Sequence, residues 1–231
     1  MLDIPTAVKQ SPLHQRLERA GALMREASGW WVAEHFGDAR AEEQAVRSQV
    51  GLFDRSATPK FEIKGKDLAE FLRSVIVGLV PEPGRACLTE SGYACRLTRY
   101  HALLVLRVVA CKEPPWVLAG PPANSCVHMV DRTNGYGALQ VCGPAALKTL
   151  RKLTSLNLQE ARFPDLSCVA GPLASVRTIV VRNDRAGLPA YDLLFSREYA
   201  EYLWDVIMEA GAEFDLRPFG RAAARSLETA Q

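Results

Sequence analysis

The chain contains 231 residues, of which 48% are hydrophobic and 23% are charged, and its formal net charge is +2. These proportions are close to the average for globular proteins, so they argue against extended disorder. A small net charge without long runs of Lys or Arg also gives no reason to expect nucleic acid as a partner.

The cysteine and histidine positions do not match the common zinc-binding motifs. Six cysteines form no Cys-x-x-Cys pair, and the four histidines are scattered along the chain, whereas structural zinc sites need clustered ligands. Residues 1–10 lack the apolar core of a signal peptide, and the longest apolar stretch, 102–110, is too short to cross a bilayer. We therefore expect a cytoplasmic protein with free thiols and no membrane contact.

A first helix is expected near the start of the chain. Ser11 followed by Pro12 is typical of a helix start, because proline at the first helical position loses no hydrogen bond. Apolar residues such as Leu17 and Met24 recur at helical spacing, and Gly29 is a natural stop.

A second helix is expected from about Asp38 to Val50. Glu42 and Glu43 lie in its first turns, where carboxylates complement the positive end of the helix dipole. This stabilising role is a sufficient explanation of the acidic pair. Gly51 then ends the helix, and a short apolar strand follows it.

Two later segments share a strand–glycine–helix pattern. Phe61 to Gly65 alternates as a strand and leads into a helix, and Leu139 to Gly143 does the same 78 positions later. Apolar residues match two and four positions before each glycine and seven positions after it. The repetition predicts a pseudo-duplicated α+β architecture, with chance similarity of two strand–helix units as the alternative.

The remaining elements are apolar strands and two late helices. Strands are expected over 94–97, 102–110, 175–181 and 191–195, with proline-marked loops at 113–115 and 120–122. Ser196 is expected to cap a helix that ends near Gly211, and the alanine-rich segment 219–231 is expected to be helical.

A set of short motifs occurs in a fixed order along the chain. The motifs are Ser11-Pro12-Leu13, Gly29-Trp30, Glu42-Glu43 with Val46-Arg47, Gly51-Leu52-Phe53-Asp54 with Ser56, and Val141-Cys142-Gly143-Pro144. Their order and spacing resemble the folate-binding aminomethyltransferase (glycine-cleavage T-protein) family. Residues 155–182, which include Ala161-Arg162-Phe163-Pro164, are similar to the gamma subunit of heterotetrameric sarcosine oxidase, a relative of this fold.

The resemblance implies an α+β fold built from the pseudo-duplicated strand–helix units of the T-protein folate-binding domain. We expect one such domain over residues 1–231, with two intertwined subdomains of approximately 1–135 and 136–231. The family's carboxy-terminal β-barrel is expected to be absent from this chain.

The family's pterin clamp aligns without gaps onto residues 182–192. Arg182 and Tyr191 are retained, and Asp192 replaces a glutamate that accepts hydrogen bonds from the pterin. A carboxylate suits this role because it only accepts and can take two donors side by side. The alternative is that Asp192 is a strand residue pointing at solvent.

Tetrahydrofolate is therefore the cofactor that the resemblance implies, with Asp192, Tyr191 and Arg182 as binding residues. Arg225 is added to this set as a stand-in, because Ala224 occupies the place of the family's folate-contacting arginine. Arg225 is one position away, which is about 100° around a helix.

The family's catalytic aspartate has no counterpart in this chain. The matching strand reads Gly92-Tyr93-Ala94-Cys95-Arg96-Leu97 and contains no carboxylate. Arginine cannot serve as a base, because its pKa keeps it charged. Glu90 is an alternative only if the alignment is out of register, so the catalytic residues are not identified.

Three functions follow from these observations. The first is a tetrahydrofolate-binding T-protein-like domain that acts as a non-catalytic or accessory subunit, with protein partners in a hetero-oligomeric complex of one-carbon or amine metabolism. The second is an active folate-dependent aminomethyltransferase or demethylase, which would need a new acid–base residue such as Glu90, Asp131 or Asp192. The third is a structural module that binds no pterin.

Overall fold

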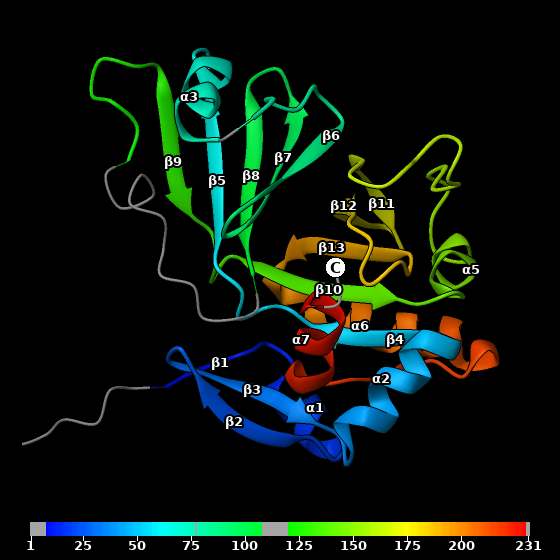
Figure 1. The fold of residues 1–231 in the computed structure, drawn as a ribbon. Helices are drawn as coiled ribbons and strands as arrows, with labels where there is room; N and C mark the ends of the chain where they lie inside the picture. Colours follow the sequence, from blue (N-terminus) through cyan, green and yellow to red (C-terminus); the bar gives the residue numbers. More distant parts are fainter. Residues whose placement is uncertain (1–7, 77, 108–119, 230–231) are drawn as a thin grey trace, which may run out of the picture.

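The computed structural model describes residues 8–76, 78–107 and 120–229 (Figure 1). In chain order its elements are β1 (Lys9–Gln10), α1 (His14–Arg19), β2 (Leu23–Ala27), β3 (Trp30–His35), α2 (Ala39–Ser48), β4 (Gly51–Asp54), β5 (Lys60–Gly65), α3 (Leu68–Val75), β6 (Arg85–Thr89), β7 (Gly92–Thr98), β8 (His101–Leu106), β9 (Val127–Asp131), β10 (Tyr136–Cys142), α5 (Ala146–Arg151), β11 (Cys168–Leu173), β12 (Val176–Arg182), β13 (Ala190–Ser196), η1 (Arg197–Tyr199), α6 (Ala200–Gly211), η2 (Ala212–Phe214), β14 (Arg217–Pro218) and α7 (Arg221–Thr229). The expected loop at 113–115 and the end of the expected strand 102–110 lie outside the described residues.

Three sheets form the framework of a mixed α/β fold. The central sheet has the strand order β11-β12-β13-β10-β4-β14, the upper sheet has the order β6-β7-β8-β5-β9, and the small sheet has the order β1-β3-β2. Figure 1 shows the central sheet across the middle of the molecule, the upper sheet above it and the small sheet below it.

The central sheet is buried on both faces. On one face its strands pack against α1, α5 and α6 through a core that includes Leu17, Leu150 and Leu203. On the other face, part of the sheet packs against β7 and β8 of the upper sheet. We call this second region the inter-sheet core; its buried members are Ala86, Tyr93, Cys95, Leu103, Val105, Ala138, Cys168, Ile179, Val181 and Leu194.

The helix α2 begins as predicted, at Asp38, whose side chain accepts hydrogen bonds from the Arg40 and Ala41 amides. Glu42 does more than complement the helix dipole. Its carboxylate accepts from the Phe36 amide at 2.5 Å and from the Gly220 amide at 2.8 Å. This side chain therefore connects the start of α2 to the segment that leads into α7.

Both strand–glycine–helix units are present, as β5 with α3 and as β10 with α5. Gly65 and Gly143 have φ angles of +157° and +125°. A Cβ atom at Gly65 would lie 1.9 Å from the Cys126 carbonyl oxygen, and one at Gly143 would lie 2.5 Å from that of Val46. Both positions therefore require glycine, and the pseudo-duplication of the two units stays a prediction.

The expected first helix is wrong at its start and in its second half. The helix α1 begins at His14, with Leu13 rather than Ser11 at the N-cap position. The helix α1 ends at Arg19 and is followed by Gly21, whose φ is +87°. The chain then forms β2, which pairs antiparallel with β3 through a turn at Ser28 and Gly29. Both turn residues have positive φ, as expected for a tight hairpin turn. Met24, whose spacing from Leu17 suggested a helix, lies in β2. It still packs against the core between the central sheet and α1, α5 and α6, which we call the main core.

Candidate functional site

Asp192 lies in the middle of β13, between β10 and β12. In the sheet register it stands opposite Gln140 on β10 and Val181 on β12, so these three side chains share one face of the central sheet. That face is the one that carries the inter-sheet core. Asp192 is only 3% exposed, which rules out the alternative of a strand residue pointing at solvent.

Both carboxylate oxygens of Asp192 accept hydrogen bonds from the chain itself. Gln140 Nε2 donates to Asp192 Oδ1 at 2.8 Å. Arg55 Nη1 donates to Asp192 Oδ2 in a buried ion pair. Burial opposes the charge on Arg55, yet the neighbouring carboxylate outweighs this and raises the pKa of the guanidinium. The ion pair therefore lies in a place that water does not reach.

Arg55 is held in place by its own backbone. It directly follows β4, and its amide donates to the Ala138 carbonyl at 2.8 Å, which extends the pairing of β4 with β10. Its side chain is 2% exposed, and Nη2 lies 3.4 Å from the Leu106 carbonyl oxygen on β8. The guanidinium thus reaches from the end of β4 into the space between the central and upper sheets.

Tyr93 on β7 completes this cluster from the upper sheet. It is fully buried, and its pKa is raised well above the ordinary value by burial and by the charge of Asp192. A tyrosine held neutral in this way does not act as a base at neutral pH, and its hydroxyl has no hydrogen-bond partner among the described residues. We call Arg55, Asp192, Gln140 and Tyr93 the Asp192 cluster.

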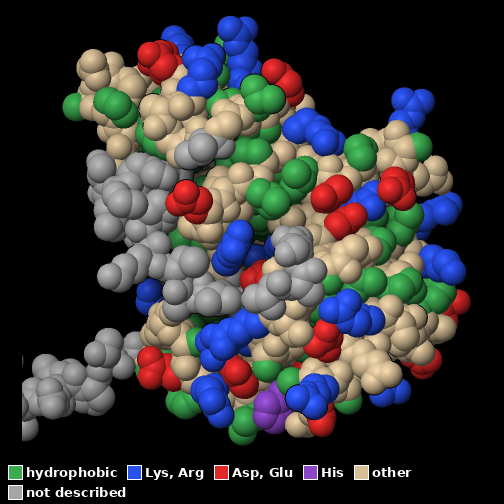
Figure 2. Space-filling view, viewed as in Figure 1, with side chains coloured by type: hydrophobic (Ala, Val, Ile, Leu, Met, Phe, Trp, Pro, Cys, Tyr) green, Lys and Arg blue, Asp and Glu red, His purple; other side chains and the backbone are tan. Residues whose placement is uncertain are grey.

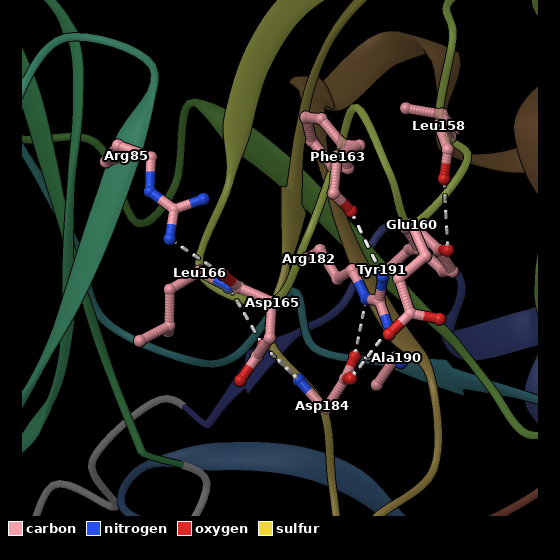
Figure 3. A network of polar contacts seen from close by, with 10 residues as sticks. All are labelled: Arg85, Leu158, Glu160, Phe163, Asp165, Leu166, Arg182, Asp184, Ala190 and Tyr191. Carbon is pink, nitrogen blue, oxygen red and sulfur yellow. Dashed lines mark hydrogen bonds and ion pairs between the residues drawn. The ribbon is translucent and has the colours of Figure 1, made fainter.

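Arg182 and Tyr191 lie on the opposite face of the central sheet from Asp192. They stand side by side in the register of β12 and β13. Arg182 makes two parallel hydrogen bonds to Asp184, each of 2.9 Å, and a third to the Phe163 carbonyl (Figure 3). The Tyr191 hydroxyl points toward the Leu158 carbonyl oxygen at 3.5 Å. The structure therefore does not bring these two residues together with Asp192.

Arg225 lies half-buried on α7, a helix whose core residues pack with Cys142 on β10 and Ala190 on β13. The helix α7 packs through Ala223, Ala224 and Leu227 into a small core with Phe53 and Phe219. Ala224 is thus a core residue in this chain, which suits a small side chain at that position.

The strand β7, which matches the family's catalytic strand, faces the Asp192 cluster with Tyr93 and Cys95. Arg96 points elsewhere: its guanidinium donates to the Pro81 and Arg99 carbonyls. Two other carboxylates that could have acted as a base are exposed. Glu90 lies in the turn between β6 and β7, and Asp131 accepts a hydrogen bond from the Thr133 amide.

The residues at Asp192 do not fit a bound pterin as they are placed. A pterin would have to donate hydrogen bonds to the carboxylate, and both oxygens already have a donor from Gln140 or Arg55. The charged Arg55 would also have to leave a site in which it balances the charge of Asp192. Tetrahydrofolate binding through this carboxylate therefore requires the ion pair to open.

The sequence interpretation missed Arg55 and Gln140. A signal for Gln140 was present, because it is the single polar residue between Leu139 and Val141 in an apolar strand. A buried polar side chain in such a strand needs a partner on the same face. Arg55 carried a weaker signal, since a charged residue directly after an apolar strand is usually solvated.

Other kinds of site receive less support. Within the described residues, no group of three or more His, Cys, Asp or Glu side chains could hold a metal ion. In the same part of the chain, no helix is long and apolar enough to span a membrane. Figure 2 shows basic and acidic side chains interspersed over the visible face, which is typical of an ordinary solvated surface.

A scan of family models matches residues 13–230 to the GCVT N-terminal domain. An aminomethyltransferase from Anoxybacillus flavithermus is 31% identical over 236 residues, covering 95% of this chain and 63% of that protein. An aminomethyltransferase from Desulfitobacterium hafniense is 28% identical over 235 residues, covering 96% of this chain and 64% of that protein. The chain thus spans less than two thirds of the length of these relatives.

Two solved structures share the fold. The glycine cleavage system aminomethyltransferase T from Bartonella henselae has a TM-score of 0.77 at 18% identity, covering 96% of this chain and 62% of that chain. The heterotetrameric sarcosine oxidase from Corynebacterium sp. U-96, in complex with pyrrole 2-carboxylate, has a TM-score of 0.63 at 21% identity. That match covers 76% of this chain and 92% of the sarcosine oxidase chain.

Proposed function

The chain belongs to the GCVT N-terminal domain family, and from this premise we propose that it is an accessory, non-catalytic T-protein-like subunit. It would work within a hetero-oligomeric complex of one-carbon or amine metabolism. The five described cysteines are free thiols, which supports a reducing compartment such as the cytoplasm.

The observation that carries this proposal is the makeup of β7. This strand faces the Asp192 cluster with a neutral Tyr93 and a buried Cys95, and its seven residues include no carboxylate. A general base must lie within hydrogen-bond reach of the proton that it removes, with a pKa near the working pH. Asp192, the one carboxylate in the cluster, is held by Arg55 and Gln140. The cluster therefore stabilises the charges of its own Arg55 and Asp192 side chains rather than a charge on a bound substrate.

An accessory role is also supported by the sarcosine oxidase match. That enzyme is heterotetrameric, and this chain covers nearly all of the matched subunit. We propose that this chain likewise contributes packing surface to a larger assembly. Tetrahydrofolate is the ligand that the family implies, and the Arg55–Asp192 pair argues against its binding at Asp192 in this chain.

The test is to isolate the tagged, full-length protein from its native source at native abundance. We expect other protein chains to co-purify in fixed stoichiometry. We also expect the purified chain alone to show no transfer of a one-carbon group to tetrahydrofolate from an aminomethylated carrier or a methylated amine. A monomeric chain that turns over with tetrahydrofolate would overturn the proposal in favour of an active aminomethyltransferase.

A further inference from the structure

A cavity of about 300 Å³ lies beside α2. Figure 1 shows this helix below β4, near the edge of the central sheet that β14 forms. We propose that the cavity binds a linear ligand with a cationic group at one end, an anionic group at the other and a short apolar chain between them. The ω-amino carboxylates are the simplest members of this chemical class. This inference goes beyond the accessory role, and no residue of the Asp192 cluster lines the cavity.

The middle of the cavity is apolar. One wall is the side of α2 that carries Ala41, Ala45 and Val46. The lining part of α2, from Asp38 to Val46, is about 12 Å long at the usual rise per residue. Along that length a volume of about 300 Å³ is narrow, so it suits an aliphatic chain better than a ring system. The remaining apolar walls are Ala20, Phe36, Val50, Pro218 and Phe219.

The start of α2 gives the cavity an anionic end. Asp38 and Glu42 both line it. Asp38 Oδ1 accepts the Ala41 and Arg40 amides, which lower the pKa of this carboxyl group and keep it ionised at neutral pH. Asp38 Oδ2 has no hydrogen-bond partner among the described residues. A cationic group at this end would therefore meet a free carboxylate oxygen.

Arg217 on β14 gives the cavity a cationic end. Its amide bonds to the Val50 carbonyl at 3.3 Å, just beyond the last residue of α2. Its side chain is exposed, lines the cavity, and makes no hydrogen bond or ion pair within the described part of the chain. The charges of Asp38 and Arg217 are thus anchored at opposite ends of a ten-residue helix, which is about 15 Å long.

Opposite charges at two ends select a ligand by the separation of its own charges. A simple carboxylate or a simple amine satisfies one end only. An α-amino acid carries both charges on the same carbon atom, so it cannot reach both ends. A linear ω-amino carboxylate reaches both, and its methylene groups contact the apolar walls.

The experiment measures binding to the purified full-length chain by calorimetry and thermal shift. The main probe is 6-aminohexanoate. Its isomer 2-aminohexanoate has the same atoms with both charges on one carbon, and hexanoate and hexylammonium each keep one charge. We expect 6-aminohexanoate to bind saturably, one per chain, at millimolar concentration or below. Each control probe should bind at least about tenfold more weakly, because it loses a charge-assisted contact.

Three variants assign each part of the ligand to a part of the cavity. Arg217→Gln should weaken 6-aminohexanoate at least about tenfold and leave hexylammonium unchanged. Asp38→Asn, which keeps an equally good helix cap, should weaken 6-aminohexanoate and leave hexanoate unchanged. Ala45→Leu fills the cavity with a good helix former and should abolish binding of every probe. Gln44→Leu, an exposed change on α2 outside the cavity, is the matched control and should bind as the wild-type protein does.

The proposal is overturned if 6-aminohexanoate does not bind at millimolar concentration, or if 2-aminohexanoate binds equally well. It is also overturned if binding survives in Ala45→Leu, or if Arg217→Gln and Asp38→Asn leave the affinity for 6-aminohexanoate unchanged. Should Ala45→Leu fail to fold, the two charge variants and the four probes decide the matter alone. All these measurements use the isolated chain and concern no partner, so their failure is distinguishable from a failure of the accessory role.

Discussion

Two arginine–carboxylate pairs lie on opposite faces of the central sheet, and they are built differently. Arg55 and Asp192 form a single pair between two sheets, where both side chains are almost fully buried. Arg182 and Asp184 lie at the edge of the opposite face, where Asp184 is 23% exposed. There the Phe163 carbonyl accepts a further hydrogen bond from Arg182 (Figure 3). The first pair has no substitute for a lost partner, whereas water and neighbouring groups can replace a lost partner in the second.

The largest effect is expected for Arg55→Ala. Removing the guanidinium leaves a buried carboxylate without its counter-charge, so we expect the free energy of unfolding to fall by about 3–5 kcal/mol. Urea denaturation measures this loss. The double variant Arg55→Ala/Asp192→Ala should lose less than the sum of the two single variants, because it leaves no unpaired charge. A loss below about 1 kcal/mol in Arg55→Ala would contradict the comparison.

A smaller loss is expected for Arg182→Ala, about 1–3 kcal/mol, because water can hydrate the exposed side of Asp184. Arg182→Lys serves as the matched control, since it keeps the charge but cannot make the two parallel bonds. Its loss should lie between zero and that of Arg182→Ala in the same denaturation experiment. If Arg182→Ala proves more costly than Arg55→Ala, the two faces do not differ as proposed.

Burial near Arg55 also predicts that the free energy of unfolding depends on pH through Lys60. This side chain is fully buried, donates to the Ser56 and Thr58 carbonyls, and burial lowers its pKa to about 7. In the unfolded chain Lys60 keeps its proton up to its ordinary pKa of 10.5. Between these values the unfolded state binds more protons, so stability rises with pH by at most about 1.4 kcal/mol per pH unit.

The measurement is the free energy of unfolding at pH 7 and pH 9 for the wild-type protein and for Lys60→Met. We expect the wild-type protein to gain more stability than the variant over this interval. Equal changes in the two proteins would mean that Lys60 keeps its proton in the folded state.

The smallest effect is expected for Tyr191→Phe. The hydroxyl lies 3.5 Å from its acceptor, at the limit of a hydrogen bond, while the ring is buried in the main core. Removing the oxygen alone should change stability by less than about 0.5 kcal/mol in urea denaturation. Tyr191→Ala, the control that removes the ring, should cost several times more. A large loss in Tyr191→Phe would assign the hydroxyl a role that the geometry does not support.

Much of the framework could be predicted from local signals. The start of α2 near Asp38, the glycines at 65 and 143 and the late helix α6 each depend on neighbouring residues, and all are present. The expected cap at Ser196 is wrong, because its side chain makes no capping hydrogen bond and α6 begins at Ala200, after the short helix η1. The first helix failed beyond Arg19 because two apolar residues seven apart fit a helix as well as they fit a helix followed by a strand. The strands β3, β6, β9 and β11 were not predicted, since their apolar alternation is weak.

Only part of the candidate site could be predicted from the sequence. Asp192 and the lack of a carboxylate on β7 could be read directly from residue types. The split between Tyr191 and Asp192 follows from strand alternation, because adjacent residues in a strand face opposite sides. The Arg55–Asp192 pair could not be predicted, since 137 positions separate its members and the fold alone brings them together.

The packing of α7 on α2 has a consequence for synthesis on the ribosome. Val46 of α2 shares a core with Phe219 and Ala223, and Phe219 stacks on Phe53 with ring centroids 5.3 Å apart. At a usual elongation rate, roughly 9 to 35 s pass between the emergence of Val46 and that of Phe219. During that interval α7 cannot cover the apolar side of α2, which stays accessible to chaperones. The packing of α2 is completed only after α7 has left the ribosomal exit tunnel.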